Sequence, residues 1–164
     1  MDVRNAQPVE LDPLARLWHD AWRDAHAEIL PPALVKVRTL ENFTERLARA
    51  LPEIRVVGPL RRPLGLCWVK DDELYQLFVA AEARGTGVAA ALVADAERTL
   101  AARGVRTAWL ACAVGNARAA RFYEKCGWHL ARTTVSELEV PGGTFEIDVW
   151  RYEKSLPSKR GHST

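Results

Sequence analysis

The residues whose types and spacing suggest chemistry begin with the segment 79–89, which reads V-A-A-E-A-R-G-T-G-V-A. An apolar strand-like run precedes it, a helix-like run follows it, and two glycines two positions apart follow Arg84. A helix N-terminus leaves backbone N–H groups unpaired and carries partial positive charge. Glycine allows positive φ and close approach of the backbone to a ligand. The segment therefore predicts a site for a pyrophosphate or similar anion.

The spacing excludes two common phosphate-binding motifs. A nucleotide P-loop needs Gly-Lys-Ser/Thr at the helix start, which is absent. A dinucleotide fingerprint needs G-x-G-x-x-G in the first strand–helix turn of a doubly wound sheet, whereas several strands are expected here before the turn. The remaining alternative to an anion site is a tight strand-to-helix turn with no ligand.

The elements that must position this turn form a parallel unit. Residues 73–79 read as a strand, 87–102 as a helix with an apolar stripe, and 105–114 as a strand buried on both faces. The candidate strands 54–57 and 64–70 precede them as an antiparallel meander. These patterns predict an α/β domain (α+β by some schemes), with a mixed, mostly antiparallel sheet, a central parallel strand pair and flanking helices.

The ends of the chain supply further elements. We expect a short strand at 2–6, a helix that Asp12 caps and that stops before Pro31, and a helix at 40–51. Asn116 should cap a helix over 117–126. A hairpin is predicted from strands 133–140 and 145–154. The domain then covers 1–156, and 157–164 reads as a flexible tail.

Composition limits the class of protein. The chain has 164 residues, 48% of them hydrophobic, and a formal net charge of +2, which gives no reason to expect nucleic acid or an anionic membrane as a partner. Three cysteines without C-x-x-C spacing read as reduced thiols of a cytoplasmic protein. The four histidines show no metal-ligand spacing, so no metal is expected. No apolar run reaches the ~20 residues of a membrane helix.

In two motifs the sequence resembles the GNAT superfamily of N-acetyltransferases. The run R84-G-T-G-V-A89 matches the family's R/Q-x-x-G-x-G/A pattern, and N116-A-R-A-A-R-F-Y-E-K-C-G-W128 is similar to its N-x-x-A-x-x-F/L-Y-x-x-x-G-F pattern. Ala81 stands where the family often has proline, and Trp128 replaces phenylalanine. Together the two motifs cover about residues 64–130.

The resemblance implies acetyl-coenzyme A as co-substrate and a primary amine as acceptor. It assigns cofactor binding to the strand backbone, to the glycine turn and to the helix cap, namely Leu77, Phe78, Val79, Arg84, Gly85, Thr86, Gly87, Val88, Ala89 and Asn116. It assigns Tyr123 as the acid that protonates the leaving sulfur, a role suited to a phenol of pKa near ~10. Dimers are common among relatives, so a homodimer is one expected state.

The general base and the acceptor site are less defined. By its position Glu73 resembles the catalytic glutamate of histone-acetylating members of the family. Alternatively, Glu73 is a surface carboxylate at a strand end with no catalytic role. A chain of water molecules is a further candidate for the base. Tyr75 shares the face of Glu73 by the two-residue period. Trp22 and His26 would shape the acceptor pocket, or Trp22 is simply core. The sequence does not identify the acceptor beyond a small molecule or a peptide.

Two other function classes stay open. The fold would equally serve a module that binds or senses an acyl-coenzyme A without catalysis, or an interaction domain with no cofactor at all. Binding of coenzyme A separates the last from the first two, and a broad amine screen separates an enzyme from a sensor.

Overall fold

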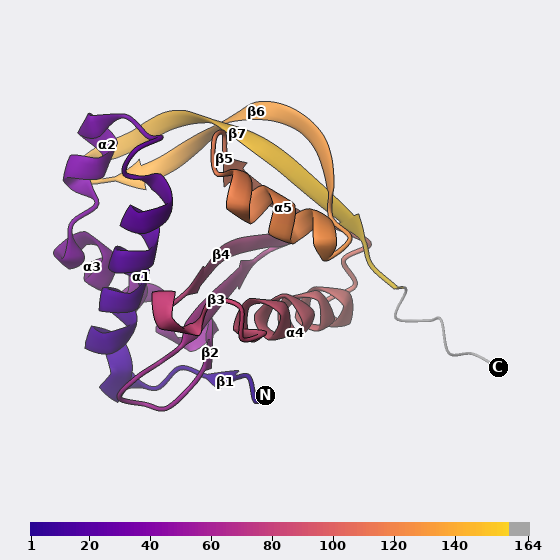
Figure 1. Ribbon diagram of the computed structural model, residues 1–164, viewed down its shortest axis with the longest axis horizontal. Helices are drawn as coiled ribbons and strands as arrows, with labels where there is room; N and C mark the ends of the chain where they lie inside the picture. Colours follow the sequence, from indigo (N-terminus) through magenta and orange to yellow (C-terminus); the bar gives the residue numbers. More distant parts are fainter. Residues whose placement is uncertain (158–164) are drawn as a thin grey trace.

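A computed structural model describes residues 1–157 of the chain, and the expected flexible tail lies outside this range apart from Pro157. The described residues form a seven-stranded sheet in the order β1-β2-β3-β4-β5-β7-β6 (Figure 1). The strands are β1 (Arg4–Asn5), β2 (Ile54–Val57), β3 (Gly65–Lys70), β4 (Glu73–Val79), β5 (Thr107–Ala113), β6 (His129–Val140) and β7 (Gly143–Ser155). All neighbouring pairs are antiparallel except β4 and β5. This confirms the predicted mixed sheet with one parallel pair.

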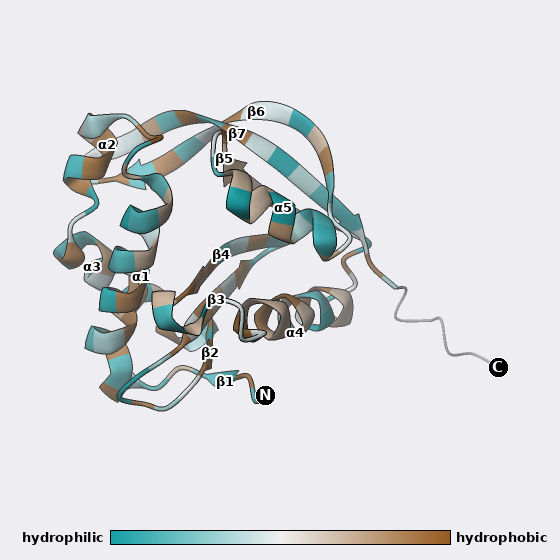
Figure 2. Cartoon of the chain, in the orientation of Figure 1, coloured by the Kyte–Doolittle hydropathy of each residue, from teal (hydrophilic) through white to brown (hydrophobic). Residues whose placement is uncertain are grey.

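Helices cover both faces of the sheet. The helices α1 (Leu11–His26), α2 (Pro32–Val37) and α3 (Leu40–Ala50) gather at one side, and α4 (Val88–Ala102) and α5 (Ala117–Lys125) lie across the sheet from them (Figure 1). Each group has its own apolar core, because the buried residues form two clusters, one beneath α1–α3 and one beneath α4 and α5. In Figure 2 hydrophobic positions recur along α1 between hydrophilic ones, as expected for a helix that buries one stripe. No helix among the described residues is long and apolar enough to span a membrane.

The parallel pair is joined only at its beginning. Glu73 pairs with Trp109, and the Trp109 amide donates to the Asp72 carbonyl oxygen over 3.3 Å. No further ladder pairing links the two strands, whereas β5 continues to pair with β7 as far as Ala113. The later half of β4 therefore diverges from β5 and leaves backbone groups there without a strand partner on that side.

Most predicted elements are confirmed to within a few residues, but the start of the first helix is wrong. The helix begins at Leu11 with Glu10 as its N-cap residue, after a short 3₁₀ turn, and not at Asp12. Glu10 is fully buried, where its carboxylate accepts from both Arg4 Nη atoms and from the Gln7 amide. The contacts of the buried Glu10 carboxylate continue the turn into the helix and override the local Asp-Pro signal. The helix α2, which starts on Pro32, was not predicted.

Candidate active site

The turn before α4 has the conformation expected of an anion-binding loop. Gly85 and Gly87 have φ of 75° and 90°, in the region that favours glycine. Gly87 is the N-cap residue of α4 and supplies no side-chain cap. Among the described residues no acceptor is found for the amides of Gly85, Gly87, Val88, Ala89 and Ala90. A row of free N–H groups at the positive end of a 15-residue helix is an arrangement that suits an anion.

Two arginines at this turn share one carboxylate. Arg84 and Arg118 both contact the Asp24 carboxylate of α1, the second at 3.4 Å. These contacts hold the pKa of Asp24 below its ordinary value, the Arg84 hydrogen bond being the largest cause. The Thr86 side chain, expected near the anion, instead donates to the Ala83 carbonyl oxygen. Neither Asp24 nor Arg118 was predicted, because only the fold brings α1 and α5 to the turn.

A cavity extends from this turn toward the sheet, and we call it the α4 cavity. It is lined by the turn, by the last residues of β4 and by one face of α5, and it includes every predicted cofactor-binding residue except Thr86. Its lining residues are Ala21, Ala25, Leu77, Phe78, Val79, Ala83, Arg84, Gly85, Gly87, Val88, Ala89, Ala90, Asn116, Arg118, Ala119, Phe122 and Tyr123.

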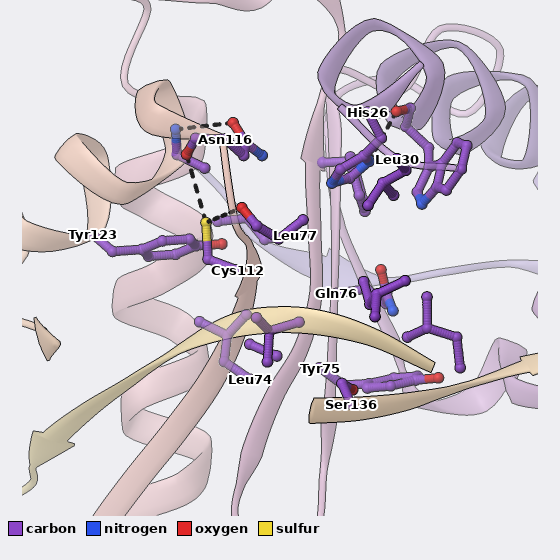
Figure 3. A pocket seen from close by; sticks show the side chains of 18 of the residues that line it. His26, Leu30, Leu74, Tyr75, Gln76, Leu77, Cys112, Asn116, Tyr123 and Ser136 are labelled. Atoms are coloured by element: carbon purple, nitrogen blue, oxygen red, sulfur yellow. Dashed lines mark hydrogen bonds between the residues drawn. The ribbon is translucent and has the colours of Figure 1, made fainter. Parts of the chain in front are cut away.

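A second cavity, the central cavity, lies between α1, the strands β4 and β5, and the β6–β7 hairpin (Figure 3). Trp22, His26, Glu73 and Tyr75, predicted from separate segments, all line it. Residues that the sequence did not single out complete it, among them Leu30, Gln76, Ser136, Leu138, Ile147 and Val149. The two cavities share Leu77, Phe78, Asn116, Ala119 and Tyr123, so they meet where β4 diverges from β5.

An irregularity in β4 increases the number of its side chains that reach the central cavity. The register with β3 shifts between Trp68 and Val69, so that Gln76 faces Trp68, Leu74 faces Val69, and Tyr75 has no partner. Such a bulge places two consecutive residues against one and bends the strand. Tyr75 and Gln76 thus both contribute to the cavity, whereas strict alternation would have turned one of them away.

Tyr123 lies at the junction of the cavities. Its ring is packed between Phe122, Trp128 and Tyr152, and the residue is only 8% exposed. Figure 3 shows its hydroxyl directed toward Cys112 and Leu77. Burial, with a smaller contribution from the nearby Cys112 thiol, raises the pKa of this phenol far above its ordinary value. Tyr123 therefore keeps its proton at every physiological pH, so that a hydroxyl hydrogen is present at the junction.

Glu73 is a half-buried carboxylate with no hydrogen-bond partner among the described residues. Burial raises its pKa to about 7, although Lys70 and Arg151 act in the opposite direction. His26 is the other candidate base. Its Nδ1 lies 2.9 Å from the Trp22 carbonyl oxygen and so carries the proton, and burial lowers its pKa to about 4. A base is most effective when its pKa lies near the working pH, so Glu73 is the better fitted of the two.

The thiol nearest the junction is not poised as a nucleophile. Cys112 is buried on β5, and its sulfur lies 3.6 Å from the Asn116 carbonyl oxygen. Burial raises the pKa of this thiol to about 12, so it remains protonated at neutral pH. The arrangement favours direct transfer between two bound molecules over a covalent thioester on Cys112.

The raised pKa of Glu73 leads to a stability prediction. Between pH 4.5 and 7 the folded chain holds a proton that the unfolded chain releases, so stability falls across this window and the full cost is present above pH 7. We expect Glu73→Gln to raise the free energy of unfolding by about 1–2 kcal/mol at pH 8 and to change it little at pH 4.5. Denaturant unfolding at both pH values measures this. Glu45→Gln, an exposed change on α3, should have no such effect, and a loss of stability in Glu73→Gln at pH 8 would contradict the assignment.

Comparison with known proteins agrees with this geometry. Residues 53–128 match the sequence model of the acetyltransferase (GNAT) family. A curated relative, a probable N-acetyltransferase of Mycobacterium tuberculosis, is 23% identical over 94% of this chain and 95% of its own. Among solved structures, a GCN5-related N-acetyltransferase from Rhodopseudomonas palustris superposes with a TM-score of 0.73 at 18% identity, covering 94% of this chain and 95% of that one. The PaiA N-acetyltransferase of Thermoplasma acidophilum, solved with coenzyme A, gives 0.67 at 16% identity over 94% and 98%.

The matched segment begins just before β2 and ends just before β6, so it contains the glycine turn, the diverging strands and Tyr123. The structural neighbours extend the agreement in fold to nearly the whole chain. Residues 53–128 therefore carry the sequence pattern of the acetyltransferase (GNAT) family, and the chain as a whole shares the fold of the N-acetyltransferases compared above.

Proposed function

We propose that this chain transfers the acetyl group of acetyl-coenzyme A to a primary amine by direct attack. The observation that supports the proposal best is the junction of the two cavities at Tyr123, in the gap between β4 and β5. One cavity begins at an anion-binding turn and the other holds a carboxylate whose pKa is about 7. Two reactants bound on the two sides would meet beside a protonated phenol.

The residues present fit the co-substrate. The free amides of Gly85 and of Gly87 to Ala90 suit its pyrophosphate, and Arg84 and Arg118 add positive charge at the same place. Along Leu77, Phe78 and Val79, the backbone groups that face the gap toward β5 have no strand partner there and offer hydrogen bonds to the amides of its pantetheine arm, as a sheet edge does to an added strand. Asn116 already caps α5 by accepting from the Ala119 amide over 3.3 Å, and its side-chain NH₂ remains for the arm.

In the proposed reaction each proton has a named place. Glu73 accepts a proton from the ammonium group, directly or through water, and leaves a neutral amine. The amine nitrogen bonds to the acetyl carbon as the carbon–sulfur bond breaks. The Tyr123 hydroxyl gives its proton to the departing sulfur, because a thiolate would otherwise leave into a buried site. The product nitrogen then carries one proton too many, and this proton returns to the Tyr123 oxygen, which restores the phenol and leaves a neutral amide. Holding both molecules in one geometry supplies much of the acceleration.

A screen of primary amines tests the proposal. Purified protein with acetyl-coenzyme A should release free coenzyme A thiol in the presence of a suitable amine, and mass spectrometry should show the acetylated product. Calorimetry with coenzyme A should show binding in the absence of any amine. Binding of coenzyme A without turnover on any amine would favour a sensing module over an enzyme. The absence of binding would contradict both of these functions.

The Asp24 contacts lead to a prediction about affinity. Because Asp24 holds Arg84 and Arg118, it competes with a pyrophosphate for both guanidinium groups. We expect Asp24→Asn to strengthen coenzyme A binding by about 3–10-fold, the effect of releasing two exposed ion pairs. Asp20→Asn, one turn earlier on α1, makes the same change in net charge and should leave the affinity unchanged. Weaker binding in Asp24→Asn would mean that Asp24 orients the arginines for the phosphates instead of competing with them.

A further inference from the structure

The wall of the central cavity carries one sign of charge and is otherwise largely apolar. We propose that the acceptor is a small apolar monoamine, whose ammonium group is its only charge and whose body is one ring or one short branched chain. This class of acceptor rests on the proposed function, because it is read from the same site. It narrows that function, because a primary amine alone could equally be an amino acid or a polyamine.

Glu73 is the one side chain of the cavity wall, within residues 1–157, that carries a charge near neutral pH. No lysine or arginine of these residues lines the cavity. His26 is neutral there, because burial lowers its pKa to about 4. Lys70 and Arg151 lie near enough to influence the pKa of Glu73, but neither lines the cavity. The cavity thus has a place for one cation and no group that neutralises a carboxylate.

Other polar side chains of the wall are uncharged hydrogen-bonding groups. Tyr75, Gln76 and Ser136 line the cavity with a phenol, an amide and a hydroxyl, none of which is charged at neutral pH. Figure 3 shows these three residues on the side of the cavity away from Tyr123. They can hydrogen-bond water or a neutral group, but they supply no charge to offset that of a carboxylate.

The reaction fixes where the substituents next to the nitrogen must lie. The nitrogen has to reach the acetyl carbon at the junction of the two cavities, beside Tyr123. A carboxylate on the neighbouring carbon would enter the central cavity with it, where the charged group, Glu73, has the same sign. An unpaired carboxylate is costly to bury, and a second carboxylate repels it. The cavity therefore disfavours amino acids.

Apolar side chains from three parts of the chain form most of the remaining wall. Trp22 and Leu30 come from α1 and the turn after it, Phe78 from β4, and Leu138 and Ile147 from the β6–β7 hairpin. All five belong to, or pack against, the apolar cluster beneath α1–α3, so the core of the fold continues into the cavity wall. An apolar body gains affinity there by leaving water.

The volume of the central cavity limits the size of that body. The cavity measures about 130 Å³. For comparison, an apolar cavity of about 150 Å³ in another protein binds benzene. The acceptor body is therefore about one ring or a short branched chain. A second ammonium group on so short a body would also lie in the cavity, where no second carboxylate is available among the lining residues.

The way into the cavity has the same character as its wall. Leu30 and Ile147 also line an outer pocket, whose apolar lining includes Val135, a residue that is 55% exposed. The charged residues that line this pocket, Glu146 and Asp148, are both acidic. Carboxylates along the approach attract a cation and repel an anion. The route thus favours an amine without a carboxylate, as the cavity does.

A matched series of amines tests charge and body separately. The probes are ethylamine, propylamine, butylamine and isopentylamine, then 2-phenylethylamine, L-phenylalaninamide and L-phenylalanine, and finally putrescine and spermidine. Calorimetry with coenzyme A present measures binding, and product mass measures transfer. Affinity should rise about fourfold for each added methylene. We expect 2-phenylethylamine to bind at least about 100-fold more tightly than L-phenylalanine, and L-phenylalaninamide to lie within about tenfold of 2-phenylethylamine.

Variants of the apolar wall locate the effect. Ile147→Asp should weaken binding of 2-phenylethylamine by at least about tenfold and abolish the rise along the alkyl series. Leu130→Asp makes the same kind of change at a position of β6 that is 51% exposed and lines neither cavity, and it should bind amines as wild type does. Unchanged coenzyme A affinity shows that a variant is folded. Should Ile147→Asp fail to fold, Ile147→Thr and Leu138→Thr carry the test, each with an expected loss of about fourfold to tenfold.

Binding and transfer separate this inference from the proposed function. A rise in affinity along the alkyl series that Ile147→Asp abolishes supports the apolar acceptor even if no acetyl transfer is found. Acetylation of L-phenylalanine as readily as of 2-phenylethylamine overturns the inference and leaves the proposed function intact. Tighter binding of putrescine or spermidine than of every monoamine, or equal affinities along the alkyl series, also overturns it. Absence of binding by all of these amines overturns the inference, whereas the proposed function fails only if the wider amine screen finds no transfer.

Discussion

Gly87→Glu should weaken coenzyme A binding by at least about 100-fold. The new side chain would stand at the N-terminus of α4 and place a negative charge beside the free amides that are proposed to hold the pyrophosphate. The space itself is open, because a Cβ at Gly87 would meet only the Met1 Cε atom at 4.0 Å. The loss would therefore come from charge and from occupation of the site, and calorimetry with coenzyme A measures it.

The other end of the same helix provides a matched control. Gly104 has φ of 85°, close to the 90° of Gly87, and a Cβ there would meet no atom within 4 Å. Gly104→Glu thus carries a similar backbone strain of about 1–3 kcal/mol and the same change in charge. It should lower stability as much as Gly87→Glu but leave coenzyme A affinity unchanged. Equal affinities in the two variants would overturn the placement of the phosphates.

Tyr123→Phe should lower kcat by roughly 100-fold, the usual effect of removing a general acid. The affinity for coenzyme A should change less than about threefold, because the ring that fills the junction is retained. The measurement is steady-state kinetics on an amine that the wild-type protein accepts, with calorimetry for the cofactor.

A neighbouring phenol serves as the control for Tyr123. Tyr152 lies 6.5 Å away, ring centroid to ring centroid, and its hydroxyl donates to the Glu124 carboxylate over 2.6 Å. Tyr152→Phe removes a buried hydroxyl from the same cluster and should cost stability but little kcat. Full activity in Tyr123→Phe would mean that the sulfur leaves without its proton.

Local sequence patterns were sufficient to predict the helices, the strands and the glycine turn before α4. Each of these features depends on a short stretch of sequence: the apolar repeat of α4, the two glycines before it, and the helix cap Asn116. The structure has all three as predicted. Tyr123 could be placed because its helix and the glycine turn belong to one strand–helix–strand unit. The α1 start failed because its cap, Glu10, is fixed by Arg4 and Gln7, a contact that helix-start preferences do not describe.

The sequence by itself determined the order of strands and helices along the chain, the glycine turn before α4 and the place of Tyr123 on α5. The tertiary structure alone decided that β4 and β5 diverge, that Asp24 holds Arg84 and Arg118, and that burial raises the pKa of Glu73 to about 7. The physical reason is how far apart in the sequence the interacting residues lie. Backbone conformation depends on neighbours a few residues away, whereas burial, and the electrostatics that follow from it, depend on which distant segments the fold brings together.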